Sequence, residues 1–379
     1  MATAAAAAHR SILDLPYEVL DLIYKELKYL RDRINLARAD AYLGGAFAFH
    51  SRDEFKNVSV FDQYISMDSW PMLLSLCGTT VREYSCCNSH NWSDALTKLV
   101  EQHCPKLEIV NVNVNARNCN SVRSVIVNAR TTIKEIKLDA DNRVPKWIPP
   151  MMLHEYPEMP LLRKATFIQF TSEELFHIQK FSTLEELELD PGKLYCRPIK
   201  LFEITANLKK LRSLKLYQYN IVEPENTEAS ATSMPFPSLE SLKMRRCKIS
   251  MEMPHCPNIT SLDIINCQWS IENVLYRFIL KQGETLVNLS IDCRPSMLDG
   301  KQFLDILRCC KRLRLFCVQA QKVKFTRDFV ATMVDILHDN GVTPDEPLRL
   351  KIYGITKTDW AAKWVSLTGN PNLLSVEYW

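Results

Sequence analysis

The residues best suited to metal binding form one short cluster in the first third of the chain. Cys86, Cys87 and His90 lie within five positions, and His103 and Cys104 follow. Thiolates and imidazoles are good zinc ligands, but structural zinc sites use paired units such as Cys-x-x-Cys or His-x-x-x-His, and this cluster contains neither. We interpret these side chains as core and loop residues and predict no metal site.

Nucleophilic catalysis would need a cysteine held beside a base. Cys77 or Cys87 could pair with a distant histidine, but a chain with 13 cysteines and eight histidines offers many such pairs by chance. No Gly-x-Gly-x-x-Gly or Gly-x-x-x-x-Gly-Lys-Ser/Thr phosphate loop occurs, and the whole chain has nine glycines. The sequence therefore predicts a nonenzymatic protein with no catalytic residue and no cofactor.

The balance of charge argues against a nucleic-acid partner. The 379 residues include 47 Lys and Arg against 44 Asp and Glu, which gives a net charge of +3. A net charge this small does not indicate binding to a polyanion such as a nucleic acid. The basic runs at residues 243–248 and 311–314 fit solvated faces beside strands, and nuclear import stays open.

Two features indicate an intracellular protein. No stretch approaches the roughly 20 apolar residues that span a bilayer, and residues 4–8 are too short for the core of a signal peptide. We therefore expect no membrane partner and a location in the cytoplasm, the nucleus or both. The odd number of cysteines, 13, with adjacent pairs at residues 86–87 and 309–310, suits reduced thiols better than a disulfide framework.

A repeated pattern, apolar-x-x-apolar-x-apolar, runs through most of the chain. Eight clear copies begin at Leu107, Ile133, Leu184, Leu211, Leu239, Ile259, Leu286 and Leu313, and weaker copies begin at Val81, Leu162, Pro347 and Leu373. Their average spacing of about 26.5 residues falls inside the range of leucine-rich repeats, which is roughly 20 to 29. A dozen copies at this period predict a repeat array.

Helical patterns fill the spaces between the copies. They cover residues 93–103, 121–129, 172–181, 271–281, 300–310, 327–338 and 359–367. A strand, a turn and a helix in each repeat predict an α/β fold, a leucine-rich-repeat solenoid over residues 57–379 with parallel concave strands and convex helices. The polar, proline-rich residues 223–238 predict an exposed loop, either a plain insertion, a phosphorylated regulatory loop or a partner-binding peptide.

Several cysteines occupy fixed positions in the repeats. Three precede a first apolar position by three residues (Cys104, Cys256 and Cys310), and two follow a third apolar position by three residues (Cys247 and Cys267). Asn115 holds the latter place in its own copy. Leucine-rich repeats use Asn or Cys at that place, where it bonds the turning backbone, so we interpret all five cysteines as buried turn residues.

The N-terminal part is organised differently. Residues 1–10 are expected to be a disordered or weakly helical tail, and residues 11–56 to form a small helical domain. Asp14 can cap a helix that begins near Pro16, and a second amphipathic stretch at residues 31–43 is expected to stop at Gly44-Gly45. A domain of about 45 residues buries little apolar surface by itself. We therefore expect it to pack against a partner or against the repeats.

This opening segment resembles an F-box. The similarity lies in Leu15-Pro16-Tyr17-Glu18-Val19-Leu20, in Ile23-Tyr24 and Leu27, and in residues 34–39. The Cys-Pro-x-Leu sequences and the turn cysteines likewise resemble the cysteine-containing subtype of leucine-rich repeats. Together the two resemblances imply the substrate receptor of a ubiquitin ligase that binds a Skp-type adaptor and, through it, a cullin-RING scaffold.

Two sets of candidate binding residues follow. The helical face expected to bind the adaptor consists of Leu15, Pro16, Val19, Leu20, Ile23, Tyr24 and Leu27. The outward positions of the central strands, expected to bind a protein substrate, are Glu186, Glu188, Asp190, Lys215, Tyr217, Lys243, Arg245 and Asp263.

Alternatives stay open for both sets and for the function. The helical face also fits a cap over the first repeat, and the strand charges also fit a sheet that only needs a polar exterior. A nonenzymatic scaffold without a role in ubiquitin transfer is the alternative function.

Overall fold

The structure is a computed structural model of the chain. It describes residues 11–59, 65–87, 92–140, 152–192, 196–223, 236–271, 273–293, 298–319, 322–353 and 373–378. The chain divides into two compact units, Met1–Leu161 and Leu162–Trp379. The N-terminal helices therefore share a unit with the first repeats. Residues 1–10, most of the loop predicted at 223–238 and the helix predicted at 359–367 lie outside the described residues.

Three short helices follow a single 3-10 turn at the start of the first unit. The turn is η1 (Ile12–Asp14), and the helices are α1 (Tyr17–Glu26), α2 (Leu30–Ala39) and α3 (Ala41–His50). Asp14 does not cap α1, because its carboxylate instead accepts a hydrogen bond from the Ser11 amide at 2.8 Å and closes η1. The carboxylate of Asp40 caps α3 by accepting from the Tyr42 amide at 2.7 Å.

The prediction that Gly44-Gly45 ends a helix is wrong, because both glycines lie inside α3. Their role is close packing. A Cβ atom at Gly45 would overlap the hydroxyl of Tyr17, and one at Gly44 would lie 3.4 Å from the backbone oxygen of Ala37. The glycines thus let α3 approach α1 and α2 closely enough to bury the apolar residues between them.

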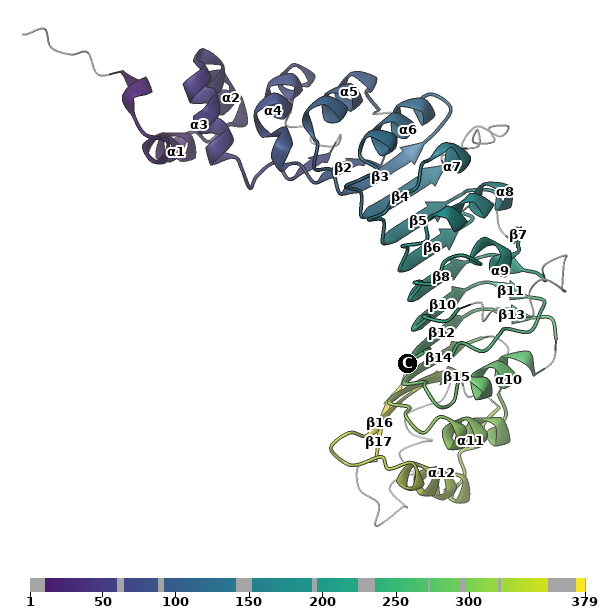
Figure 1. Cartoon of the computed structure of the whole chain (residues 1–379). Coiled ribbons are helices and arrows are strands. Elements are labelled where there is room, and N and C mark those ends of the chain that lie inside the picture. The colour runs from purple at the N-terminus through teal and green to yellow at the C-terminus, as the bar shows by residue number, and fades with distance from the viewer. Residues whose placement is uncertain are drawn as a thin grey trace, which may run out of the picture. The chain divides into compact units, whose positions relative to one another are not determined.

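The first unit continues with parallel strands and stacked helices (Figure 1). The strands are β1 (Asn57–Ser59), β2 (Glu83–Cys86), β3 (Ile109–Val114) and β4 (Glu135–Ala140). The helical elements are η2 (Met67–Ser69), α4 (Trp70–Cys77), η3 (Gly78–Thr80), α5 (Asp94–His103), α6 (Cys119–Asn128) and α7 (Met152–Glu155). Because α3 lies against α4, the N-terminal helices rest on the first repeat, as expected for so small a segment.

The second unit contains nine parallel strands of the same kind. They are β5 (Lys164–Ile168), β6 (Glu186–Asp190), β8 (Ser213–Tyr217), β10 (Ser241–Arg245), β12 (Ser261–Ile265), β14 (Asn288–Asp292), β15 (Leu315–Gln319), β16 (Leu348–Tyr353) and β17 (Leu374–Tyr378). All twelve predicted copies coincide with a strand, and within each unit neighbouring strands pair at equivalent positions of the pattern. The leucine-rich-repeat solenoid is therefore confirmed.

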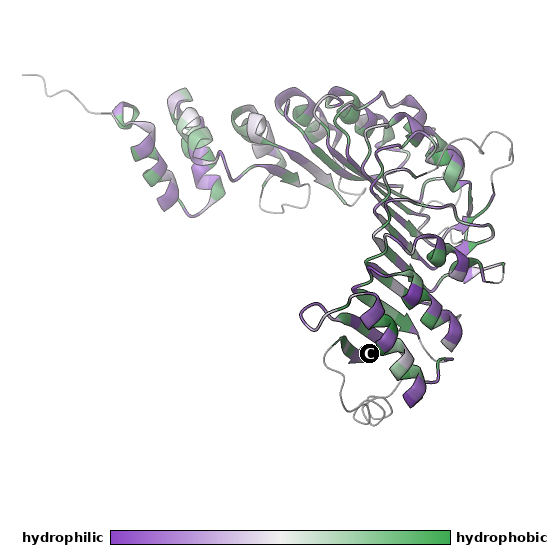
Figure 2. Ribbon diagram, turned by 60° about the horizontal axis from the view of Figure 1, so that its bottom comes forward, coloured by the Kyte–Doolittle hydropathy of each residue, from purple (hydrophilic) through white to green (hydrophobic). Residues whose placement is uncertain are grey.

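Alternation along each strand separates two faces, which Figure 2 shows as alternating hydrophobic and hydrophilic residues. In β6, Leu187 and Leu189 are buried while Glu186, Glu188 and Asp190 point to the other side. Helices cover the apolar face, and the polar face stays open among the described residues (Figure 1). We call this polar side of the second unit's sheet the open face.

The prediction of one helix per repeat is wrong in the middle of the second unit. Its helical elements are α8 (Ser172–Leu175), η5 (Phe176–Lys180), α9 (Leu201–Ile204), α10 (Val274–Lys281), α11 (Gly300–Cys309) and α12 (Arg327–Asp339). A second parallel sheet lies among them, formed by β7 (Pro198–Ile199), β9 (Asn220–Ile221), β11 (Lys248–Ile249) and β13 (Gln268–Trp269). The connection from β10 to β12 holds no helix, because it is short and contains Pro254 and Pro257.

A left-handed residue turns the chain at the end of several strands. Gln169, Gln218, Arg246 and Asn266 all have φ between 51° and 65°. The Gln218 amide donates to the carbonyl of Arg245 in the next repeat at 2.8 Å, and Arg246 repeats this bond with Ile265 at 2.8 Å. These bonds between repeats offset the strain of a non-glycine residue in the left-handed region.

Candidate interaction surfaces

The seven residues predicted to bind the adaptor fall into two groups. Leu20 and Tyr24 are fully buried between the three helices, so they belong to the interior of the domain. The Tyr24 hydroxyl donates to the carbonyl of Leu43 at 2.9 Å, and burial raises the pKa of Tyr24 to about 12. The other five are accessible: Pro16 and Val19 are exposed, and Leu15, Ile23 and Leu27 are half-buried.

Exposed apolar side chains gather in the N-terminal part of the chain. Among the described residues, ten large apolar side chains are exposed, and seven of them lie between residues 12 and 67. The sequence interpretation missed Leu22, which is 59% exposed. The available signal was an apolar residue on the side of α1 opposite the buried Leu20 and Tyr24.

These residues form one continuous strip on α1 and just before it. Val19 lies three residues before Leu22 and four before Ile23, so the three side chains are neighbours on the helix surface. Leu15 and Pro16 precede the same helix turn. We call Leu15, Pro16, Val19, Leu22 and Ile23 the N-terminal apolar surface.

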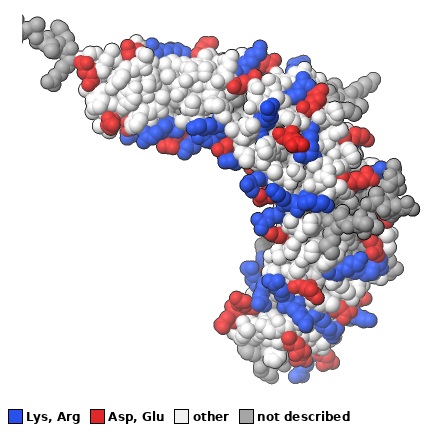
Figure 3. Space-filling view, in the orientation of Figure 1, with Lys and Arg blue, Asp and Glu red and all other residues white. Residues whose placement is uncertain are grey.

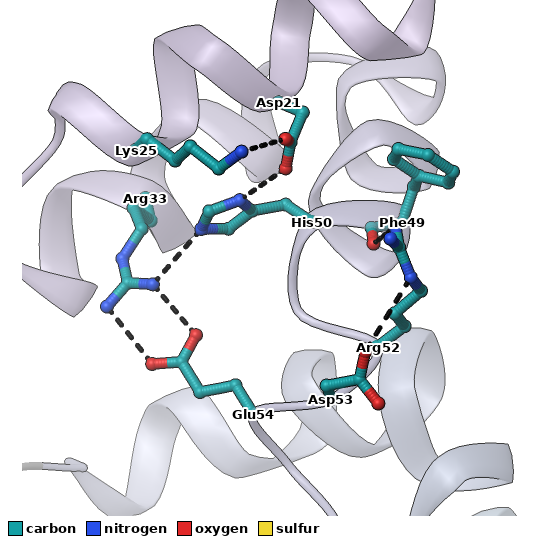
Figure 4. Close-up of polar contacts among 8 residues, drawn as sticks. All are labelled: Asp21, Lys25, Arg33, Phe49, His50, Arg52, Asp53 and Glu54. Carbon is teal, nitrogen blue, oxygen red and sulfur yellow. Dashed lines mark hydrogen bonds and ion pairs between the residues drawn. The ribbon is translucent and has the colours of Figure 1, made fainter.

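A polar network holds α1, α2 and the end of α3 together (Figure 4). The Nδ1 atom of His50 lies 2.8 Å from the Asp21 carboxylate, which also pairs with Lys25 at 2.7 Å. Arg33 approaches the Nε2 atom of His50 at 3.4 Å and forms two bonds to Glu54, at 2.8 and 3.2 Å. The bond to Lys25, then that to His50, lowers the pKa of Asp21.

The His50–Asp21 pair looks like a catalytic base with its orienting carboxylate, but its geometry serves structure. In a base the Nε2 atom would accept a proton from a nucleophile. Here Nε2 faces the guanidinium of Arg33 instead, and Nδ1 lies against the carboxylate of Asp21. The network therefore fixes the helices that carry the N-terminal apolar surface.

All eight residues predicted to bind the substrate lie on the open face of the second unit. The strand register places Glu188, Lys215, Lys243 and Asp263 in one row across β6, β8, β10 and β12. Their charges pair with one another: Lys215 lies 3.6 Å from Glu188, and Lys243 lies 2.8 Å from Asp263. This row is thus largely neutralised within the sheet, which the sequence interpretation did not foresee.

The remaining four lie on either side of that row. Glu186 is exposed at the start of β6, and Asp190 accepts a hydrogen bond from the Gly192 amide at 2.8 Å. Tyr217 and Arg245 are register partners on β8 and β10. Burial and then Glu188 raise the pKa of Tyr217, while Lys243 and Arg245 oppose this shift. Basic and acidic side chains are interspersed on the face drawn in Figure 3.

The turn cysteines are buried as predicted. The Sγ atom of Cys247 donates to the carbonyl of Leu216 at 3.5 Å, and that of Cys267 donates to Met244 at 3.4 Å. Burial raises the pKa values of Cys104, Cys256 and Cys310 to about 12. The predicted Asn115 performs the same turn function, because its side chain accepts from the amide of Arg117 at 2.8 Å.

Thiol reactivity should follow this burial. All 13 cysteines are free, and Cys87, Cys196 and Cys309 are the exposed ones. At neutral pH we expect a thiol reagent to modify these three rapidly in the folded protein, and all 13 after denaturation without reductant. Mass spectrometry of the labelled protein measures both numbers. Several cysteines that resist labelling after denaturation would indicate native disulfides and an oxidising compartment.

No group of three or more His, Cys, Asp or Glu side chains within the described ranges could hold a metal ion. In the predicted cluster, Cys86 is buried and Cys87 exposed, and His90 lies outside the described residues. Among the helices that the structure describes, none is long and apolar enough to cross a membrane.

Comparison with known proteins yields similarities of fold only. No protein-family model matches the chain, and no curated protein matches it. An internalin from Listeria monocytogenes is 14% identical with a TM-score of 0.48, over 91% of this chain and 94% of that one. A structure of the Rad7 and Elc1 complex from yeast is 13% identical with a TM-score of 0.39, over 95% of this chain and 92% of the matched chain.

Proposed function

We propose that this chain is the substrate-recognition subunit of a multisubunit ubiquitin ligase. It binds a Skp-type adaptor through its N-terminal helices, and through the adaptor a cullin-RING scaffold, and it binds a protein substrate on the open face. The observation that carries the proposal is the concentration of exposed apolar side chains between residues 12 and 67. Exposed apolar side chains that lie side by side, as Val19 and Leu22 do on α1, mark a site of protein interaction.

The N-terminal apolar surface has the character of a docking site for a partner's helices. Val19 and Leu22 are 38% and 59% exposed, although both are large aliphatic residues on a regular helix. Burying them against a partner would remove apolar area from water, which is the main source of binding free energy in such contacts. The resemblance of residues 15–20 to an F-box supports a Skp-type adaptor as this partner.

The proposed mechanism needs no bond-making residue in this chain. One end of the protein binds the adaptor, and the open face binds the substrate. Holding both together raises the effective concentration of the substrate near the ligase's loaded enzyme, and this accelerates ubiquitin transfer. The polar strand face, which no described helix covers, supplies a broad surface for the substrate.

Affinity purification with quantitative mass spectrometry tests both ends of the protein. Removal of residues 11–50, which leaves β1 and all later strands, should eliminate the adaptor and cullin from the retained proteins and keep the substrate. The double variant Lys215→Glu/Arg245→Glu should lose the substrate and keep the adaptor.

The matched control is Lys248→Glu/Arg312→Glu, since both residues are exposed and lie off the open face. It should retain both classes of partner. Circular dichroism verifies that each variant keeps the repeats folded. If the intact chain retains no Skp-type adaptor, the ligase function is wrong and the scaffold alternative replaces it.

A further inference from the structure

The open face presents its side chains in three rows that run across the strands. The first row, from β8 to β14, is small and uncharged: Ser213, Ser241, Ser261 and Asn288. The middle row contains the ion pairs described above. A further pair, between Lys351 and Glu377 at 2.6 Å, continues the middle row on β16 and β17. Neither row offers an unpaired positive charge between β8 and β14 among the described residues.

The third row is different in composition. From β6 to β14 it consists of Asp190, Tyr217, Arg245, Ile265 and Asp292. The register pairs Arg245 with Tyr217 on one side and with Ile265 on the other. A cation thus lies between two apolar side chains, and a carboxylate lies beyond each of them.

Arg245 is the cation of this row, and it is accessible to a partner. Its side chain is exposed, and it forms no ion pair within the described part of the chain. It lies close enough to Tyr217 to oppose the rise in the pKa of that hydroxyl. An exposed guanidinium with apolar neighbours provides both charge recognition and contact area, the combination typical of binding hot spots.

We infer that the third row selects a substrate segment with an Asp or Glu carboxylate between two apolar side chains and with basic residues outside them. The inference rests on the proposed function, because it specifies the substrate class of the same face. The row crosses four strand spacings of about 4.8 Å, which is about 19 Å in total. The acid meets Arg245, the apolar residues meet Tyr217 and Ile265, and the basic residues meet Asp190 and Asp292.

The surrounding charges favour a carboxylate over a phosphate at Arg245. Five carboxylates face outward on β6 to β14 (Glu186, Glu188, Asp190, Asp263 and Asp292), against three cations (Lys215, Lys243 and Arg245). A phosphoryl group carries nearly two negative charges and is bound by clusters of arginines. A single arginine inside a net negative field suits one carboxylate better.

A displayed library of random nine-residue peptides, selected on the immobilised full-length chain, tests this inference. We expect enrichment of peptides with a central acid and apolar flanks. Selection on Arg245→Glu should enrich a central Lys or Arg instead, because the variant reverses the charge that the peptide meets. Selection on Lys248→Glu, an equal charge change at an exposed position off the open face, should reproduce the parent motif.

Fluorescence anisotropy with one enriched peptide gives the size of the effect. We expect Arg245→Glu to weaken binding about tenfold or more, and phosphoserine in place of the central acid to weaken binding to the parent chain. An unchanged motif on Arg245→Glu, a parent motif without an acid, or tighter binding of the phosphoserine peptide would overturn the inference.

The result is separable from the test of the proposed function. If the acidic motif fails while Lys215→Glu/Arg245→Glu still removes the substrate, the substrate class is wrong and the open-face site stands. If the motif holds while no adaptor is retained, the ligase function fails and the peptide site stands.

Discussion

Replacement of Ile23 by Lys is expected to reduce affinity for the Skp-type adaptor about a thousandfold. Ile23 borders Val19 on the N-terminal apolar surface and is half-buried in the free protein. A lysine there would place a charge within an apolar contact, at a cost of several kcal/mol, and every ~1.4 kcal/mol corresponds to a tenfold change in the dissociation constant. Isothermal titration calorimetry with the purified adaptor measures the loss.

A matched substitution controls for the added charge. Ile271→Lys makes the same change at an isoleucine of the second unit that is 42% exposed, and it should leave adaptor affinity unchanged. Because Ile23 is half-buried, its variant could also disturb the helices, so Leu22→Lys serves as a second probe at a 59% exposed position. Undiminished binding by folded Leu22→Lys and Ile23→Lys proteins would exclude this surface as the docking site.

The repeats were predictable because their spacing and alternation are encoded locally. Each copy supplies the three apolar residues that one strand buries, and a period of about 26 residues places successive strands side by side. The strand β1 was missed, although Phe55, Val58 and Val60 fit all three apolar positions and the copy begins 26 residues before the one at Val81.

The outer elements were less predictable, since they depend on the length available between strands. A helix needs several turns to bury an apolar side, and the connection between Leu239 and Ile259 is too short and contains two prolines. The prediction that Gly44-Gly45 ends a helix failed for a related reason. Glycine ends helices when the chain must turn, but inside α3 it allows two helices to approach, which only the packing reveals.

For the candidate sites, the sequence predicted which face a residue lies on better than it predicted which contacts that residue makes. Strand alternation correctly placed on the open face all eight residues that are predicted to bind the substrate. It did not show that Lys243 would pair with Asp263, since that contact joins two neighbouring strands. Periodicity on α1 likewise grouped Val19 with Tyr24, but it does not tell which side of a helix another helix covers.

Tyr24 shows the consequence of this ambiguity, and its replacement by Ala should lower the stability of the helical domain by about 4 kcal/mol. The ring is fully buried, stacks on His50 at 5.6 Å and meets Phe47 edge-on at 5.6 Å. Its removal leaves a cavity and also removes the hydrogen bond to Leu43, and large-to-small changes of this kind cost roughly 3–5 kcal/mol. Tyr24→Phe removes only the hydroxyl and should cost about 1 kcal/mol.

Hydrogen–deuterium exchange over residues 17–50 measures the effect where it arises, since local opening of the three helices governs exchange there. Protection should fall about a thousandfold in Tyr24→Ala. Tyr29→Ala makes the same change at a tyrosine that is 72% exposed. It should leave the free energy of local opening within about 0.5 kcal/mol of the parent value. Because Tyr24 is interior, Tyr24→Phe should keep full adaptor affinity. Lost adaptor binding in Tyr24→Phe with unchanged protection would instead make Tyr24 a direct contact, and the helices would have to separate when the adaptor binds.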